Sequence, residues 1–176
     1  MRYSRIVAEF QQPIYRYCCR MLANRQDAED AVQDILVKSY QRLHQYGRSD
    51  NFAAWLYRIA YRHCLNLLRK RKIHRQAMRM LRPEAASASA EQELDDRLFD
   101  PALAAALTRL SAKERNLLVL RVFEEKSYAE IGEMLGTRPN ALIKRMQRIV
   151  RKVRGMMNAE EEIAWNEQPM PLNTKI

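Results

Sequence analysis

Glycine and cysteine are scarce in this chain, and each scarcity excludes a class of structure. Only 4 of the 176 residues are glycine, and no run of alternating β-branched residues occurs, so the composition favours helix almost throughout. The three cysteines, Cys18, Cys19 and Cys64, are odd in number and show no CxxC spacing. A disulfide framework and a zinc site are therefore not indicated, and we expect no metal or cofactor.

Long apolar runs are also missing. The first ten residues mix charges without an apolar signal core, and no run approaches membrane-spanning length. We therefore expect a soluble protein of the reducing cytoplasm with no membrane insertion. The three histidines lie far apart, without a matching nucleophile and carboxylate, so we expect that the protein is no enzyme.

Acidic residues are absent from two stretches, 51–83 and 134–159. Together these stretches carry about half of the 31 Lys and Arg residues of a chain whose formal net charge is +10. The segment between them, 84–100, is instead acidic. Two basic platforms joined by an acidic tether predict one polyanionic ligand bound at two places, and we interpret that ligand as nucleic acid.

Apolar residues recur at helical intervals along most of the chain, which predicts an all-α fold. Helices are expected over residues 2–22, from about 27 to 46 and from Phe52 onward, and Pro13 is expected to mark a kink or a break. The predicted boundaries are residues 1–76 for a small N-terminal helical domain, 77–101 for a flexible acidic linker, 102–158 for a small C-terminal helical domain and 159–176 for a loose tail.

Residues 127–148 have the spacing of a helix-turn-helix, and they open on the capping-box pattern Ser-Tyr-Ala-Glu. Gly132 is small where two helices must cross closely, and Gly136 supplies a left-handed residue for the turn. Leu142 follows at the position that fills the core from the second helix. The C-terminal domain is therefore expected to contain a DNA-binding helix-turn-helix.

The helix after this turn divides into two faces. An inward apolar stripe leaves a polar and basic set projecting outward, which suits a recognition helix in the major groove. The outward set comprises Lys144, Arg145, Gln147, Arg148 and Arg151. The alternative interpretation is an ordinary amphipathic helix with a solvated basic face. The glycine, turn and core spacings together favour the recognition helix.

The helix that begins at Phe52 interleaves aromatic and cationic residues, as in the succession of Trp55 and Arg58. Aromatic faces stack on exposed bases and cations follow the phosphates, a combination suited to single-stranded or melted DNA. The alternative for Phe52 and Trp55 is packing in a core, because both lie at core spacing. Tyr46, before this helix, is less obviously needed for a core.

Four runs of the sequence resemble sigma factors of bacterial RNA polymerase. The run Asp27-Ala-Glu-Asp-Ala-Val-Gln-Asp-Ile-Leu36 and the run Phe52-Ala-Ala-Trp-Leu-Tyr-Arg-Ile-Ala60 resemble the main sigma domain. The runs Leu110-Ser-Ala-Lys-Glu-Arg115 and Tyr128-Ala-Glu-Ile-Gly-Glu-Met-Leu-Gly136 resemble the promoter-recognising C-terminal sigma domain. With only these two domains, the chain resembles the extracytoplasmic-function group.

The resemblance implies a promoter-specificity subunit that joins core RNA polymerase at its clamp helices and flap, stabilises promoter opening and is controlled by an anti-sigma factor. The polymerase-binding residues that it implies are Asp27, Asp30, Gln33 and Asp34. For the melted minus-ten element it implies Tyr46, Trp55, Arg58, Ile59 and Arg62. For the minus-thirty-five element it implies Lys144, Gln147 and Arg148, with Arg145 and Arg151 as candidates for its phosphates.

Two other function classes stay open at this point. A conventional regulator would use the helix-turn-helix alone and bind duplex operator without polymerase. An RNA-binding protein would use the aromatic and basic helix, also without polymerase. Dependence on polymerase therefore separates a sigma factor from both. Ile143 departs from the family pattern, in which a cation is common at this position, and this leaves the base preference open.

Overall fold

The computed structural model describes residues 3–46, 51–81 and 101–166, and within these ranges the chain is helical and contains no strand. The all-α prediction is confirmed. The elements are α1 (Tyr3–Leu22), α2 (Arg25–Gln41), a short 3₁₀ turn η1 (Leu43–Gln45), α3 (Phe52–Leu81), α4 (Pro101–Arg109), α5 (Ala112–Leu118), a π-helical turn η3 (Val119–Phe123), α6 (Tyr128–Leu135) and α7 (Pro139–Asn166).

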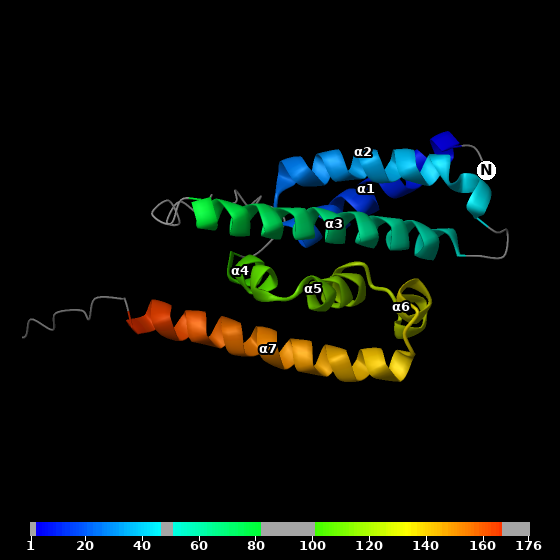
Figure 1. Cartoon of the computed structure of the whole chain (residues 1–176). Helices are drawn as coiled ribbons and strands as arrows, with labels where there is room; N and C mark the ends of the chain where they lie inside the picture. Colours follow the sequence, from blue (N-terminus) through cyan, green and yellow to red (C-terminus); the bar gives the residue numbers. More distant parts are fainter. Residues whose placement is uncertain (1–2, 47–50, 82–100, 167–176) are drawn as a thin grey trace, which may run out of the picture.

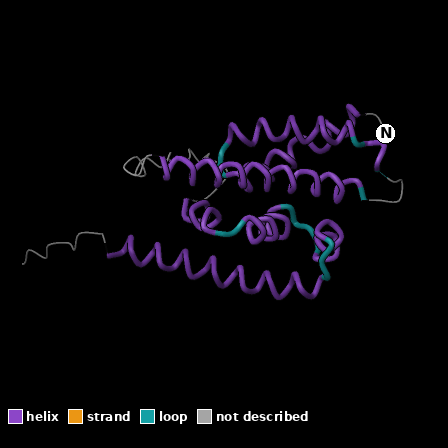
Figure 2. Tube along the Cα trace, in the orientation of Figure 1, coloured by secondary structure: helices purple, strands orange, loops and turns teal. Residues whose placement is uncertain are grey.

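The helices form an N-terminal unit and a C-terminal unit that pack on each other. Helices α1, α2 and α3 contact one another in the first unit, and α7 contacts α4, α5 and α6 in the second. In Figure 1, α4, α5 and α6 lie between α3 and α7, and Figure 2 shows that short loops join them. Contacts of α3 with α6, and of α1 with α5 and η3, hold the units together.

The N-terminal unit follows directly from its apolar periodicity. The Asn24 side chain accepts a hydrogen bond from the Asp27 N–H at 2.8 Å and so starts α2. Behind this cap, α2 buries a stripe that includes Ile35, which belongs to the same core cluster as Ile14 of α1 and Leu56 of α3, all with no exposed surface. Burial of each such side chain stabilises the fold by about 1.5–3 kcal/mol.

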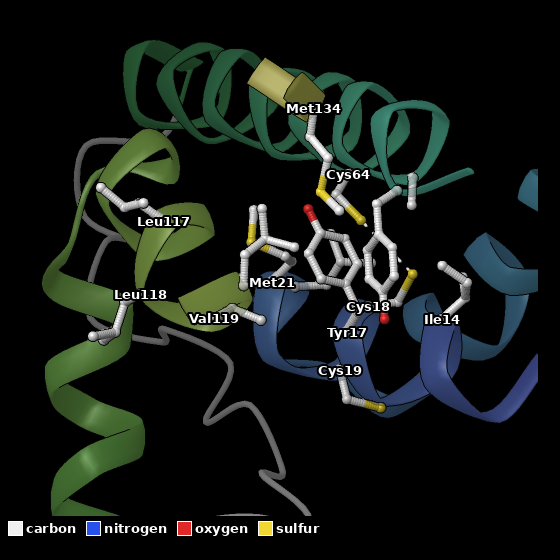
Figure 3. Close-up of a cluster of buried hydrophobic side chains, with 14 of the residues drawn as sticks. Ile14, Tyr17, Cys18, Cys19, Met21, Cys64, Leu117, Leu118, Val119 and Met134 are labelled. Carbon is white, nitrogen blue, oxygen red and sulfur yellow. Dashed lines mark hydrogen bonds between the residues drawn. The ribbon is translucent and has the colours of Figure 1, made fainter. Parts of the chain in front are cut away.

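The two units share one continuous hydrophobic cluster (Figure 3), and two polar contacts cross between them beside it. The hydroxyl of Tyr17 in α1 donates to Oδ1 of Asn116 in α5 at 2.6 Å, and both residues are buried. A buried Arg115 donates from Nη1 to the Met21 carbonyl at 2.7 Å. Because buried polar groups are costly when unpaired, these bonds fix how the two units fit together.

Glu124 forms a second polar connection between the units. Its carboxylate accepts a hydrogen bond from the Tyr57 hydroxyl of α3 at 2.6 Å, and it pairs with Arg20 of α1 at 3.4 Å. Only 5% of its side chain is exposed. Burial raises the pKa of Tyr57 well above its ordinary value, and the bond to Glu124 raises it further. Tyr57 therefore remains a neutral donor in this contact.

Several helix ends differ from the predicted boundaries. Helix α1 continues through Pro13, because the partly buried Val7 and Phe10 before the proline and the buried Ile14 after it pack against the hydrophobic core. Helix α2 ends at Gln41, and η1 follows it. Helix α3 reaches Leu81, into the range predicted as linker, and α7 reaches Asn166, into the range predicted as tail. Most of the predicted acidic linker, 82–100, lies outside the described residues.

Candidate nucleic-acid interface

The helix-turn-helix forms as the glycine spacing predicts. Ser127 and Glu130 cap α6 reciprocally, and these hydrogen bonds lower the pKa of the Glu130 carboxyl. A Cβ on Gly132 would come within 2.7 Å of the Thr137 carbonyl oxygen, so only glycine permits this approach. Gly136 ends α6 with φ of 62°, in the left-handed region. These features fix the angle at which α7 leaves the turn.

Helix α7 begins at Pro139, which suits a first helical turn because its missing N–H would have no intrahelical acceptor. Just before it, the Arg138 carbonyl accepts from the N–H groups of Ala141 and Leu142. Leu142 is 1% exposed and Met146 is 6% exposed, so this side of α7 faces the core. The start and the rotation of the helix are thereby both determined.

All the residues predicted to face the minus-thirty-five element are exposed on α7: Lys144, Arg145, Gln147, Arg148 and Arg151. Two of the guanidinium groups lie along the helix itself. Arg148 donates from Nε to the Lys144 carbonyl, and Arg151 donates from Nε to the Gln147 carbonyl, each at 3.4 Å. These side chains extend from a rigid helix, which leaves their terminal nitrogens on the polar face for phosphates or base edges.

Four of the residues predicted for the minus-ten element form one stripe on α3, since Trp55, Arg58, Ile59 and Arg62 follow helical spacing. Tyr46 joins this stripe through ring contacts, with its centroid 5.7 Å from that of Trp55. Trp55 also packs on Phe52 at 5.4 Å. The core alternative is confirmed for Phe52, which is buried, whereas Trp55 and Tyr46 are half-buried and their contact with DNA bases stays a prediction.

Arg58 connects the minus-ten stripe to the C-terminal unit. Its Nη2 donates to the Glu133 carbonyl of α6 at 3.3 Å. Its Nε is buried and has no hydrogen-bond partner among the described residues. Arg62, one turn further along α3, is exposed. Arg62 is therefore open to solvent, whereas Trp55 and Arg58 are both half-buried and Arg58 is bonded to α6.

A cavity of about 470 Å³ lies between α3 and the C-terminal unit. Tyr61 of α3 lines it from the N-terminal unit, and Arg145 and Arg148 line it from α7. Its remaining walls come from α5, α6 and the turn that follows α6. Two residues predicted for the minus-thirty-five element, Arg145 and Arg148, therefore border this space, and Tyr61, next to Arg62 of the minus-ten stripe, borders it from the other side.

The acidic face of α2 is less uniform than predicted. Asp30 and Gln33 are exposed, but Asp27 pairs with Arg71 of α3. Asp34 lies 3.4 Å from Lys38 Nζ and 3.8 Å from His63 Nε2. The ion pair of Asp27 with Arg71 thus helps to hold α2 on α3. Arg71 belongs to the first acid-free stretch, so one cation of that stretch has a structural role.

Two apolar residues on the same side of α2 were missed by the sequence analysis. Val37 is 52% exposed and Tyr40 is 58% exposed. Val37 follows Gln33 by four residues, and Tyr40 follows Val37 by three. Helical periodicity could therefore have placed both on the same side of α2 as Gln33. An exposed apolar pair next to carboxylates is typical of a surface that another protein covers.

The three cysteines lie in the interior of the protein. Cys18, Cys19 and Cys64 are buried and form no disulfide, and the sulfur atoms of Cys18 and Cys64 lie 3.8 Å apart. The contact with Cys64 and burial raise the pKa of Cys18, which disfavours the reactive thiolate.

Among the described residues, no helix is long and apolar enough to cross a membrane.

Comparisons with known proteins fit this geometry. The family model for Sigma-70 region 2 matches residues 6–74, and the model for Sigma-70, region 4 matches residues 101–153. The RNA polymerase sigma factor YlaC of Bacillus subtilis is 30% identical over 132 residues, which cover 73% of this chain and 76% of that protein. The ECF RNA polymerase sigma factor SigW of the same species is 28% identical over 143 residues, 76% of each chain.

The fold also has a counterpart among solved structures. The sigma factor RpoE of Bartonella quintana, crystallised in complex with the anti-sigma factor NepR, superposes with a TM-score of 0.69. The match covers 89% of this chain and 96% of that one, at 19% sequence identity. At this identity the likeness concerns the arrangement of helices.

Proposed function

This chain belongs to the extracytoplasmic-function sigma factors of bacterial RNA polymerase, and we propose that two of its helices, α3 and α7, divide the recognition of one promoter. As a sigma factor it binds core polymerase and confers promoter specificity. In our proposal α7 contacts the minus-thirty-five element as intact duplex. Helix α3 contacts the minus-ten element after its strands separate.

The observation that carries this division is the chemical contrast between two surfaces on one chain. Over residues 139–158, helix α7 carries no aromatic residue and presents a polar and cationic face, which fits a major groove whose bases remain paired. Helix α3 presents Trp55 beside Arg58 and Arg62, which fits unpaired bases and their phosphates. A duplex-binding regulator would have no use for the second surface.

The spacing of the two elements implies that the two units separate on a promoter. Elements near positions −10 and −35 lie about 25 base pairs apart, or roughly 85 Å along duplex DNA at about 3.4 Å per pair. Tyr61 and Arg148 line one cavity of about 470 Å³, so the surfaces beside them lie far closer together than that. We infer that the bonds made by Asn116 and Glu124 break when the protein joins polymerase on DNA.

The polymerase contact is proposed for the exposed side of α2. Asp30, Gln33 and Asp34 supply its polar part, and Val37 and Tyr40 supply an apolar part. Apolar anchors beside charges give both affinity and orientation in a protein interface. We assign this face to the polymerase clamp helices and the C-terminal unit to the flap, and place the protein in the cytoplasm with the polymerase.

Control by an anti-sigma factor is proposed from the relative whose structure contains one, since RpoE was crystallised with NepR. Such a partner would hold the sigma factor away from polymerase. We infer that the protein acts by binding and positioning, and that it catalyses no reaction itself. Polymerase supplies the chemistry of RNA synthesis.

The test is run-off transcription with purified core polymerase, followed by sequencing of the transcripts' 5′ ends. Our proposal predicts promoter-specific starts that require both the polymerase and this chain. The competing function is a helix-turn-helix regulator, which would bind duplex operator with full affinity in the absence of polymerase. Specific operator binding by the chain alone, without any specific start when polymerase is added, would favour the regulator.

A further inference from the structure

The first turns of α7 carry an uncharged strip within an otherwise cationic surface. Asn140, Ile143 and Gln147 are all exposed, and their spacing places them on one side of the helix. Asn140 is the second residue of α7, directly after Pro139. Cations flank the strip, as Lys144 does, but none lies within it.

The hydrophobic core does not account for the apolar side chain of Ile143, because this side chain lies outside it. The apolar residues of α7 that face the core are 1–6% exposed at Leu142, Met146 and Ile149, whereas Ile143 is 37% exposed. Its side chain projects to the polar side of the helix, between the two amide side chains. Removal of this apolar surface from water would be favourable if a ligand offered an apolar partner there.

The major groove offers that partner at A·T pairs. The thymine C5-methyl group projects into the groove and packs against apolar side chains, while Asn and Gln form bidentate hydrogen bonds with adenine. In helix-turn-helix proteins, residues near the N-terminus of the recognition helix contact base edges. Ile143 lies in the second turn of α7, with Asn140 before it and Gln147 after it.

We propose that Ile143 is a specificity-determining residue that contacts a thymine methyl group in the minus-thirty-five element, between adenine contacts made by Asn140 and Gln147. This inference rests on the proposed function, because it assumes that α7 lies in the major groove of that element. It predicts that the upstream element contains adjacent A·T pairs.

The experiment removes the methyl group without altering base pairing. The promoter is the one identified by 5′-end sequencing, and each thymine of its upstream element is replaced in turn by deoxyuridine. With holoenzyme containing the unaltered chain, one position should lose about fourfold in initiation, the value for burial of one methyl group. Ile143→Ala should lose about as much on the thymine promoter and show no further loss on deoxyuridine.

Val150→Ala is the matched control. Val150 follows Ile143 by two helical turns on the same side of α7, and it is 40% exposed against 37%. It lies beyond the turns that approach base edges, so Val150→Ala should keep the full fourfold dependence on the methyl group. Both substitutions remove exposed apolar surface and introduce a residue that favours helix.

Three outcomes are decisive in different ways. If Ile143→Ala keeps the full penalty for deoxyuridine, or if no thymine matters, the inference is overturned while promoter-specific starts leave the proposed function intact. If Val150→Ala also abolishes the penalty, the effect belongs to the helix as a whole and the inference fails. If the unaltered chain gives no promoter-specific start, both the proposed function and this inference fall.

Discussion

The two candidate DNA surfaces differ in how much the fold depends on them. On α7 the five outward residues are exposed, and the core is formed by other residues, such as Leu142. On α3, Trp55 stacks on Phe52, and Arg58 donates to the C-terminal unit. A surface on an independent face can change its base preference without loss of stability. A surface made partly of packing residues cannot, because each change there also alters the fold.

The difference also concerns availability. The face of α7 opposite its buried stripe is open in the described structure. On α3, Arg58 is half-buried and bonded to the Glu133 carbonyl of α6 while the units remain packed. Duplex contact by α7 is therefore compatible with the packed arrangement, whereas full use of the α3 stripe requires separation. Each prediction below tests one side of this contrast, from the largest expected effect to the smallest.

The most damaging single change is expected at the crossing of α6 and α7. In Gly132→Ala the new Cβ would lie 2.7 Å from the Thr137 carbonyl oxygen, a backbone atom that can move only with the turn. We expect a loss of about 3 kcal/mol in the free energy of unfolding, measured by denaturant titration, and a loss of minus-thirty-five recognition. Gly155→Ala is the control, because nothing lies within 4 Å of its Cβ. A gain of about 0.5–1 kcal/mol is expected there, and equal effects at both glycines would refute the packing argument.

Arg148→Ala tests whether the α7 face acts in DNA recognition alone. Arg148 is exposed, and its one described hydrogen bond is to its own helix, so the fold should remain unchanged. Recognition of the minus-thirty-five element should weaken by about 1–3 kcal/mol in promoter-binding assays with holoenzyme. Affinity for core polymerase should not change. Asp30→Ala should instead weaken the affinity for core polymerase and leave recognition of the minus-thirty-five element unchanged. Equal losses in both assays for Arg148→Ala would contradict the placement of Arg148 on the DNA-facing side.

Tyr57→Phe tests whether the packed arrangement covers the α3 stripe. The substitution removes the Tyr57 hydroxyl, which donates to the buried Glu124 carboxylate at 2.6 Å, and leaves that carboxylate paired with Arg20. The free energy with which the two units associate should fall by about 1 kcal/mol. The expected readout is a larger hydrodynamic radius with unchanged α7 binding to duplex DNA. Tyr128→Phe is the control, because Tyr128 packs against Arg121 within the C-terminal unit. An unchanged radius for Tyr57→Phe would show that Glu124 does not hold the units together.

The smallest expected effect is a pH dependence of stability at His63 of α3, which lies beside Asp34 and Lys38 of α2. Burial lowers the pKa of His63 below its ordinary 6.5, and Lys38 lowers it further, against the opposing charge of Asp34. The unfolded chain therefore binds a proton more readily, so this part of the stability is present above pH 6.5 and falls as the pH drops toward the lowered pKa. His63→Gln should reduce the loss of unfolding free energy between pH 7.5 and 5.5. The exposed His74→Gln should not, and identical pH slopes for His63→Gln and the unaltered chain would contradict the assignment.

Local features of the fold were accessible from the sequence, and long-range pairings were not. The cap at Ser127 and Glu130, the close approach at Gly132 and the left-handed Gly136 each depend on residues no more than five positions apart. The bond between Tyr17 and Asn116 joins residues 99 positions apart and leaves no periodic trace in the sequence. The sequence therefore predicted two helical units, but not that they pack on each other.

The candidate site shows the same limit. The outward residues of α7 could be predicted because one periodic stripe, once assigned to the core, fixes the opposite face. The partners of Asp27 and Arg58 could not, because an acidic or basic residue on a helix looks the same whether it is solvated or paired across helices. Val37 and Tyr40 were accessible in principle, since they continue the exposed face of α2.

The central claim is that two surfaces held together in the free chain contact two separated promoter elements. A fluorescence energy-transfer pair placed at Gln76→Cys on α3 and Asn158→Cys on α7, both exposed, measures this directly. The native cysteines are buried and should react slowly with the dyes. We predict efficient transfer in the free chain and a marked fall in the complex with polymerase and promoter DNA, where the elements lie roughly 85 Å apart. Unchanged transfer in that complex would contradict the account.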